Sequence, residues 1–156
     1  MSGSSEAPGR FRTALLHPDP GPADDLDGRI EAACRAIEAA GEAEADLLLL
    51  PEAYPGPMRR PGPGDPDAEI ALAAASEKAG VAVCWSRLES SGDAVFVVAY
   101  LTDADGARCL RYVRSHPATG DVHPVLHGAH VSPGDGIADE ELDGVRLGIA
   151  ICSELW

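Results

Sequence analysis

The chain has 156 residues, with 26 acidic and 12 basic side chains, and its net charge is −14 at pH 7. This length is enough for one domain with a hydrophobic core. The negative charge argues against a protein that binds nucleic acids or anionic membranes. No apolar segment reaches the ~20 residues that a membrane span needs. The four cysteines show no Cys-x-x-Cys spacing, which favours free thiols in a cytoplasmic protein.

Hydrophobic periodicity predicts strands and helices that alternate at first and later give way to hairpins. The expected elements are, in chain order, a strand at 11–17, a helix at 26–41, a strand at 46–50, a helix at 65–79, and strands at 81–86, 94–102, 108–114 and 145–151. The polar start of the chain predicts a disordered tail at 1–10 rather than a signal peptide. The order βαβαββββ predicts an α/β fold with a mixed sheet and helices on at least one face.

Two of the predicted strands end at reactive side chains. Val145–Ile151 is mostly apolar and is followed by Cys152, and the apolar run that ends at Leu50 is followed by Pro51 and Glu52. A thiol and a carboxylate at the ends of core strands suggest a nucleophile and its general base. The alternatives are an inert core thiol at Cys152 and a surface acid at Glu52.

Three segments, in this order, resemble the carbon–nitrogen hydrolase (nitrilase/amidase) superfamily. "LLLLPEAYPG" resembles the segment with the general-base glutamate, at Glu52. "RYVRSHPATGD" resembles the segment that carries the family's lysine, and "GVRLGIAICSELW" resembles the nucleophile segment, at Cys152. The resemblance covers residues 11–156. It implies a nitrilase-type αββα sandwich of four layers, usually paired as a homodimer through one helical layer.

The chain departs from the family pattern in two ways. Arg114 stands where the family has lysine, and Lys78, on a predicted surface helix, is no substitute for it. Arg114 is expected to stabilise the negative charge of the reaction, and the alternative is a solvated arginine at a strand edge. Family chains also continue well past the cysteine. We therefore expect this chain to be about the N-terminal half of the sandwich, truncated just after the nucleophile.

The resemblance also implies residues that contact the substrate. Asp121 falls where many relatives carry a second active-site glutamate. Glu154 falls at a position that lines the pocket in relatives with a similar Cys-Ser-Glu-Leu-Trp segment. Tyr54 and Trp156 are expected to line the cleft as well. The alternatives are a loop acid at Asp121 and core packing for Tyr54 and Trp156.

The implied reaction is hydrolysis of a non-peptide carbon–nitrogen bond in a small amide, carbamoyl compound or nitrile. It proceeds through a thioester on Cys152 and needs neither a metal nor a cofactor. A rival interpretation is an inactive remnant or association module, because the family's lysine is missing. A third is a metal-dependent hydrolase built on His116, His123, His127 and His130, of which the last three have spacings that suit one helix face. Prolines and glycines in that stretch oppose a regular helix.

Overall fold

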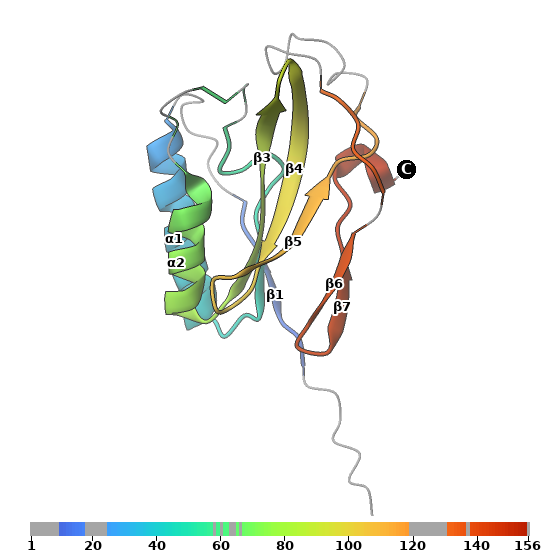
Figure 1. The fold of residues 1–156 in the computed structure, drawn as a ribbon. Coiled ribbons are helices and arrows are strands. Elements are labelled where there is room, and N and C mark those ends of the chain that lie inside the picture. Colours follow the sequence, from blue (N-terminus) through green and yellow to red (C-terminus); the bar gives the residue numbers. More distant parts are fainter. Residues whose placement is uncertain are drawn as a thin grey trace, which may run out of the picture.

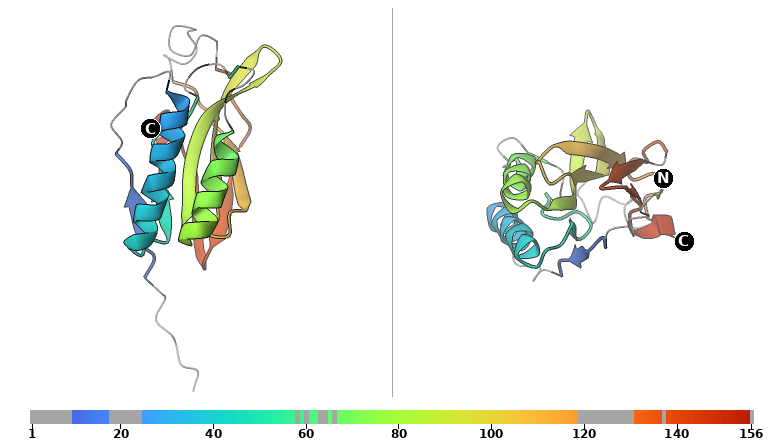
Figure 2. Two further views of the ribbon diagram at one scale, coloured as in Figure 1. Left: turned by 90° about the vertical axis from the view of Figure 1, so that its left-hand side faces the viewer. Right: turned by 90° about the horizontal axis from the view of Figure 1, so that it is seen from below.

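Two helices, a five-stranded mixed sheet and a β-hairpin form three layers in the computed structural model (Figure 1). The helices cover one face of the sheet and the hairpin lies over the other, as the end-on view confirms (Figure 2). The structure describes residues 10–17, 25–57, 59, 61, 62, 65, 67–118, 131–136 and 138–155. In this part of the chain no helix is both long and apolar enough to cross a membrane.

The elements follow the predicted order, with one additional strand. They are β1 (Thr13–Leu15), α1 (Leu26–Glu42), β2 (Leu47–Leu49), α2 (Ala68–Ala79), β3 (Ala82–Ser91), β4 (Ala94–Thr102), β5 (Arg108–Val113), β6 (Asp139–Leu142), β7 (Val145–Gly148) and the 3₁₀ helix η1 (Cys152–Leu155). The large sheet has the order β1-β2-β3-β4-β5, with β1, β2 and β3 parallel and the later pairs antiparallel. Since parallel neighbours need crossover connections, α1 and α2 link the first three strands.

Capping side chains fix where the helices begin. The carboxylate of Asp25 accepts the N–H of Gly28 at 2.9 Å ahead of α1. The prediction that α2 begins at Asp65-Pro66 is wrong, because Asp67 caps α2 and accepts the N–H of Glu69 at 3.0 Å. Gly80 ends α2 as predicted, in the left-handed conformation with φ 67° that glycine adopts without strain.

The core lies between the helices and the sheet. Ala33, Ile37 and Leu72 are fully buried there. Trp85 and Tyr100 stack with ring centroids 4.7 Å apart. On the other face, smaller apolar clusters join the sheet to the hairpin and to the segment that follows it. This second interface is the one that positions the candidate site.

The β6–β7 hairpin corrects two sequence predictions. The acidic strand Asp139–Leu142 was not predicted, although Asp143-Gly144 is a typical hairpin turn with φ 50° and 77°. The strand predicted at 145–151 ends already at Gly148. Three residues therefore separate this strand from Cys152, and the cysteine does not lie at a strand end.

Candidate active site

Glu52 and Cys152 line one small pocket of about 160 Å³ on the hairpin side of the sheet. The remaining lining residues are mostly apolar and comprise Leu50, Cys84, Trp85, Ser86, Ala99, Ile149, Ala150 and Ile151. Burial, and secondarily the neighbouring Cys109, raises the pKa of Cys84 to about 11. The thiol of Cys84 is therefore protonated and unreactive at neutral pH, and Cys84 only lines the pocket.

Glu52 lies in a turn just after β2 that Ser86 of β3 holds in place. The hydroxyl of Ser86 accepts the N–H of Ala53 at 2.6 Å and donates to the carbonyl of Pro51 at 3.4 Å. Ala53 has a φ of 54°, which is uncommon for a residue other than glycine. Ser86 was not predicted as a site residue. A single serine directly after the apolar run Val81–Trp85 is the only sequence signal for it.

Cys152 is carried by a short segment that packs back onto the sheet. Ile151 is buried against Val97, Ala99 and Tyr112, and this contact anchors the segment. Cys152 itself is exposed and begins η1 with a φ of 50°. A left-handed backbone at a non-glycine residue costs on the order of 1–3 kcal/mol, and such strain clusters at functional sites.

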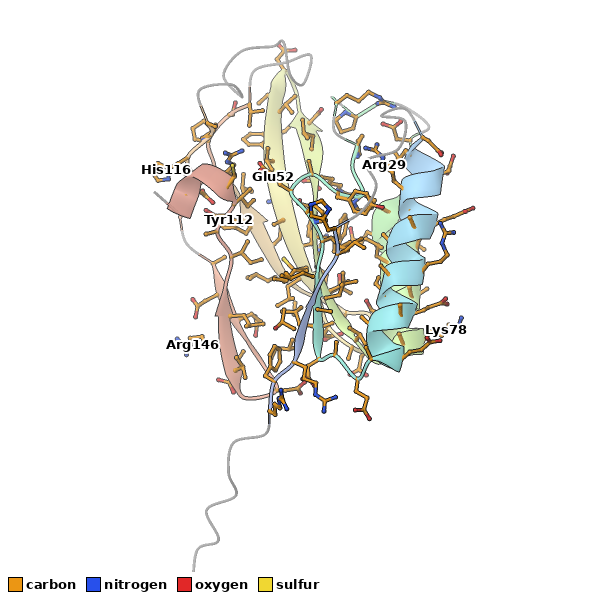
Figure 3. All side chains as sticks on the ribbon, turned by 180° about the vertical axis from the view of Figure 1, so that it is seen from behind. Arg29, Glu52, Lys78, Tyr112, His116 and Arg146 are labelled. Atoms are coloured by element: carbon orange, nitrogen blue, oxygen red, sulfur yellow. The ribbon has the colours of Figure 1, made fainter. Side chains whose placement is uncertain are left out.

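Arg114 reaches the same region from the end of β5. Its side chain is 2% exposed, and its Nη1 lies 2.7 Å from Oε1 of Glu52, whose side chain is 36% exposed. The alternative of a solvated arginine at a strand edge is therefore wrong. Lys78 lies at the other end of the molecule (Figure 3), where its ammonium pairs with Glu38 of α1 at 2.5 Å. The structure thus brings Glu52 to Arg114 and leaves Lys78 remote.

The carboxylate of Glu154 contacts the protein itself on both of its oxygens. Oε2 accepts the N–H of Ile151 at 2.8 Å, and Oε1 accepts the hydroxyl of Tyr112 at 2.6 Å and the N–H of Ser115 at 2.5 Å. Partial burial by itself raises the pKa of Glu154, but hydrogen bonds, first from Tyr112 and then from Ser115, lower it to about 2. Figure 3 shows Tyr112 and His116 beside η1.

The other predicted site residues are placed as follows. Tyr54 is buried in the core between sheet and helices, and its hydroxyl donates to the carbonyl of Arg29 at 3.1 Å, which favours the packing role. Several predicted residues lie outside the described part of the chain, namely Asp121, Trp156 and the histidines at 123, 127 and 130. Among the described residues, no group of three or more His, Cys, Asp or Glu side chains is arranged to hold a metal ion.

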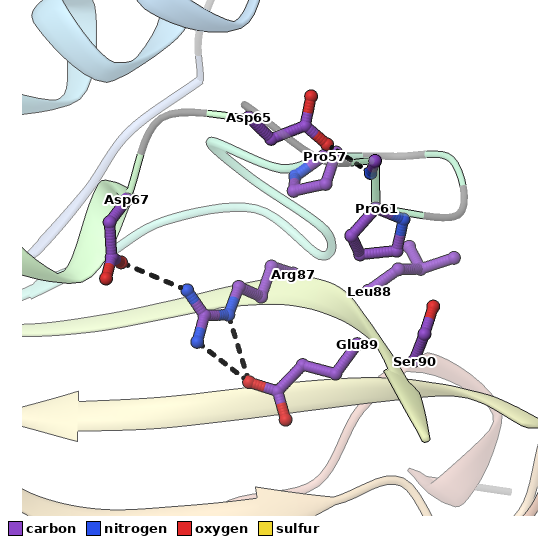
Figure 4. Close-up of a pocket in the computed structure, with 9 residues that line it drawn as sticks. Pro57, Pro61, Asp65, Asp67, Arg87, Leu88, Glu89 and Ser90 are labelled. Carbon is purple, nitrogen blue, oxygen red and sulfur yellow. Dashed lines mark hydrogen bonds and ion pairs between the residues drawn. The ribbon is translucent and has the colours of Figure 1, made fainter. Parts of the chain in front are cut away.

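A second pocket, of about 340 Å³, lies where the loop after β2 meets β3 (Figure 4). Its central charge is Arg87, which pairs with Asp67 at 3.3 Å and with Glu89 at 2.9 Å. Asp65, on its rim, pairs with Arg59 at 2.8 Å. The acidic side chains of this pocket are engaged in ion pairs and no cysteine lines it. The pocket of Glu52 and Cys152 is therefore the candidate active site.

Comparisons with known proteins agree on one family. Residues 12–156 match the sequence model described as Carbon-nitrogen hydrolase. N-carbamoylputrescine amidase of Solanum lycopersicum is 25% identical, over 85% of this chain and 48% of the relative. An amidase structure from Nesterenkonia sp. has a TM-score of 0.74 at 20% identity, over 98% of this chain and 59% of that chain. The chain therefore has the fold of these amidases and spans about half the length of the curated relative.

Proposed function

Because this chain belongs to the carbon–nitrogen hydrolase family, we propose that it provides the nucleophile, the general base and a cation for hydrolysis of a small amide. The observation that carries the proposal is the meeting of Glu52 and Cys152 in one pocket, with Arg114 paired to Glu52. Nothing in the sequence order requires this meeting, since the three residues follow three different strands.

The proposed reaction has two steps. The Glu52 carboxylate accepts the thiol proton of Cys152, and the sulfur attacks the amide carbon. The carbon–nitrogen bond breaks, the leaving amine takes the proton from Glu52, and a thioester remains on Cys152. Glu52 then accepts a proton from water, whose oxygen attacks the thioester carbon. The carbon–sulfur bond breaks, the sulfur takes the proton back from Glu52, and the carboxylic acid is released.

Arg114 has two tasks in this proposal. Its guanidinium holds one oxygen of the Glu52 carboxylate at 2.7 Å and so orients the base. Its positive charge also stabilises the oxyanion that forms on the amide, together with the backbone N–H after Cys152. A guanidinium does not pass on a proton at neutral pH, so Glu52 carries all proton transfer.

An amide is the favoured substrate class, ahead of carbamoyl compounds and nitriles. One structurally similar Nesterenkonia amidase, a cysteine-to-alanine mutant, is in complex with the amide butyramide. The apolar lining and small volume of the pocket fit a compact, uncharged group next to the reacting carbonyl. Homodimerisation and a cytoplasmic location stay predictions.

The rival is an inactive remnant, and the presence of arginine in place of the family's lysine favours it. Ammonia release from a panel of short aliphatic amides, measured with the full chain and with Cys152→Ala and Glu52→Gln, separates the two. The proposal expects turnover that Cys152→Ala abolishes and that Glu52→Gln lowers by about 10²–10⁴-fold. Turnover that survives in both variants contradicts the proposal, and no turnover in any protein supports the remnant.

A further inference from the structure

We propose that Glu154 is a positioning residue, whose carboxylate fixes the turn that carries Cys152 to the end of β5 that carries Arg114. This inference rests on the proposed function, because it states how the nucleophile and the cation are held relative to each other. Glu154 is 40 residues from Arg114 in the chain and two from Cys152, so its side chain spans two separate segments.

The two carboxylate oxygens serve two different segments. Oε2 accepts the N–H of Ile151 at 2.8 Å, next to Cys152. Oε1 faces four donors around the end of β5: the Tyr112 hydroxyl at 2.6 Å, the Ser115 N–H at 2.5 Å and hydroxyl at 2.7 Å, and the His116 N–H at 3.1 Å. Ser115 follows Arg114 directly, so the bond to its N–H acts on the backbone that places the guanidinium.

Only a carboxylate satisfies both sides of this arrangement. Each side presents backbone N–H groups, that of Ile151 to Oε2 and those of Ser115 and His116 to Oε1, so each side requires an acceptor. A glutamine has the same shape but only one acceptor oxygen, and its NH₂ group faces N–H donors on one side or the other. Glu154→Gln therefore leaves at least one of these partly buried N–H groups without an acceptor.

Glu154 also closes the turn around the strained residue. Its backbone N–H donates to the carbonyl of Ile151 at 3.2 Å, while its side chain accepts the N–H of Ile151. Cys152 lies between these two bonds with its φ of 50°. A strained backbone persists only where its surroundings determine it strongly. The two bonds of Glu154 supply that restraint at the nucleophile.

The test is the pH profile of Cys152 alkylation by iodoacetamide, resolved by peptide mass spectrometry in the full chain. Wild-type Cys152 is expected to react faster at pH 7 than the partly buried Cys84. Glu154→Gln is expected to slow Cys152 at least fivefold at pH 7 and to move its profile to higher pH. Glu141→Gln, at an exposed acid of β6, is the matched control and is expected to change neither.

The outcomes separate this inference from the proposed function. A Cys152 profile in Glu154→Gln that equals the wild-type profile, even with a lower melting temperature, overturns the positioning role. If wild-type Cys152 reacts no faster than a simple alkyl thiol and the chain shows no amide turnover, the result contradicts the proposed function on which this inference rests. If Glu154→Gln does not fold, Tyr112→Phe decides, since it removes one donor and is expected to move the profile in the same direction by a smaller amount.

Discussion

Arg114 occupies the position where the resemblance implies lysine, and the structure shows it buried and paired with Glu52. A guanidinium is planar and binds a carboxylate with directional hydrogen bonds, whereas an ammonium is a compact point charge with transferable protons. The substitution therefore keeps the positive charge and the orientation of the base. In the proposed mechanism it gives up proton transfer by the cation.

Replacement of Arg114 tests whether its charge acts on the nucleophile. Arg114→Met is expected to slow Cys152 alkylation at pH 7 about tenfold, because a nearby cation favours the reactive thiolate. Arg114→Lys is expected to preserve alkylation within about twofold and to raise amide turnover, since an ammonium is smaller and passes a proton. Equal alkylation rates in wild type and Arg114→Met show that the guanidinium has no influence on the sulfur.

Glu154 predicts a specific dependence of stability on pH. Its pKa of about 2 in the folded chain lies below the ordinary 4.5. The carboxylate therefore contributes stability that is fully present above pH 4.5 and is lost as the pH falls toward 2. We expect on the order of 1 kcal/mol, after allowance for solvent screening. Urea midpoints of wild type and Glu154→Gln should approach each other as the pH falls from 4.5 toward 2, and a constant difference over this range contradicts the assignment.

Among the elements, the strongly periodic ones could be predicted from sequence, and the short polar ones could not. The helix that contains Ile30 and Ile37 was evident from its apolar stripe, and β4 from its run of apolar residues. The strand β6 was missed because Asp-Glu-Glu-Leu has no apolar alternation. Its pairing with β7 and the packing of Leu142 against the sheet stabilise it. The start of α2 was misplaced because both Asp65 and Asp67 are suitable caps in the sequence.

The site could be predicted only as far as its motifs reach. The motifs identify Glu52, Arg114 and Cys152 as candidate site residues, each following a predicted strand, but the sequence order alone does not require that they meet. The roles of Ser86 and Ser115 were not predicted, because a serine that holds a turn has no distinguishing pattern in a single sequence. The strain at Cys152 was not predicted either, since backbone dihedrals depend on the tertiary contacts of Ile151 and Glu154.

Gly134, in the segment after β5, lies too close to Val113 to accept a larger side chain. Its N–H donates to the carbonyl of Arg114 at 2.8 Å, and an added Cβ would lie 2.4 Å from Cγ1 of Val113. Gly134→Ala should therefore destabilise the fold by about 1–3 kcal/mol. Gly148→Ala, where the nearest atom lies at 4.0 Å, is the control and should stay within about 0.5 kcal/mol. Equal urea midpoints for the two variants contradict this contact.

At the scale of the whole molecule, the sheet exposes apolar surface at β1. This strand pairs only with β2 among the described elements, and its Leu15 is 76% exposed. Edge strands of this kind promote association between chains. The nitrilase-type sandwich implied by the family would cover more of the sheet than the single hairpin described here does.

We therefore expect the chain to associate as its concentration rises, and Leu15→Lys to weaken that association. Ile70→Lys, at an exposed apolar residue of α2, is the matched variant that tests pairing through the helical layer. Light scattering over a hundredfold range of dilution measures both. A wild-type chain that stays monomeric at all concentrations, with a sharp reversible melt, contradicts the expectation.

The central claim is that Cys152 and Glu52 form one working nucleophile and base. Its most direct test is the intact mass of the full chain after rapid acid quenching of a reaction with a short aliphatic amide, with the adduct mapped by peptide mass spectrometry. The claim predicts an acyl adduct on Cys152 alone, absent from Cys152→Ala and formed at least about 10²-fold more slowly in Glu52→Gln. An adduct on another cysteine, or one formed at the wild-type rate in Glu52→Gln, would contradict it.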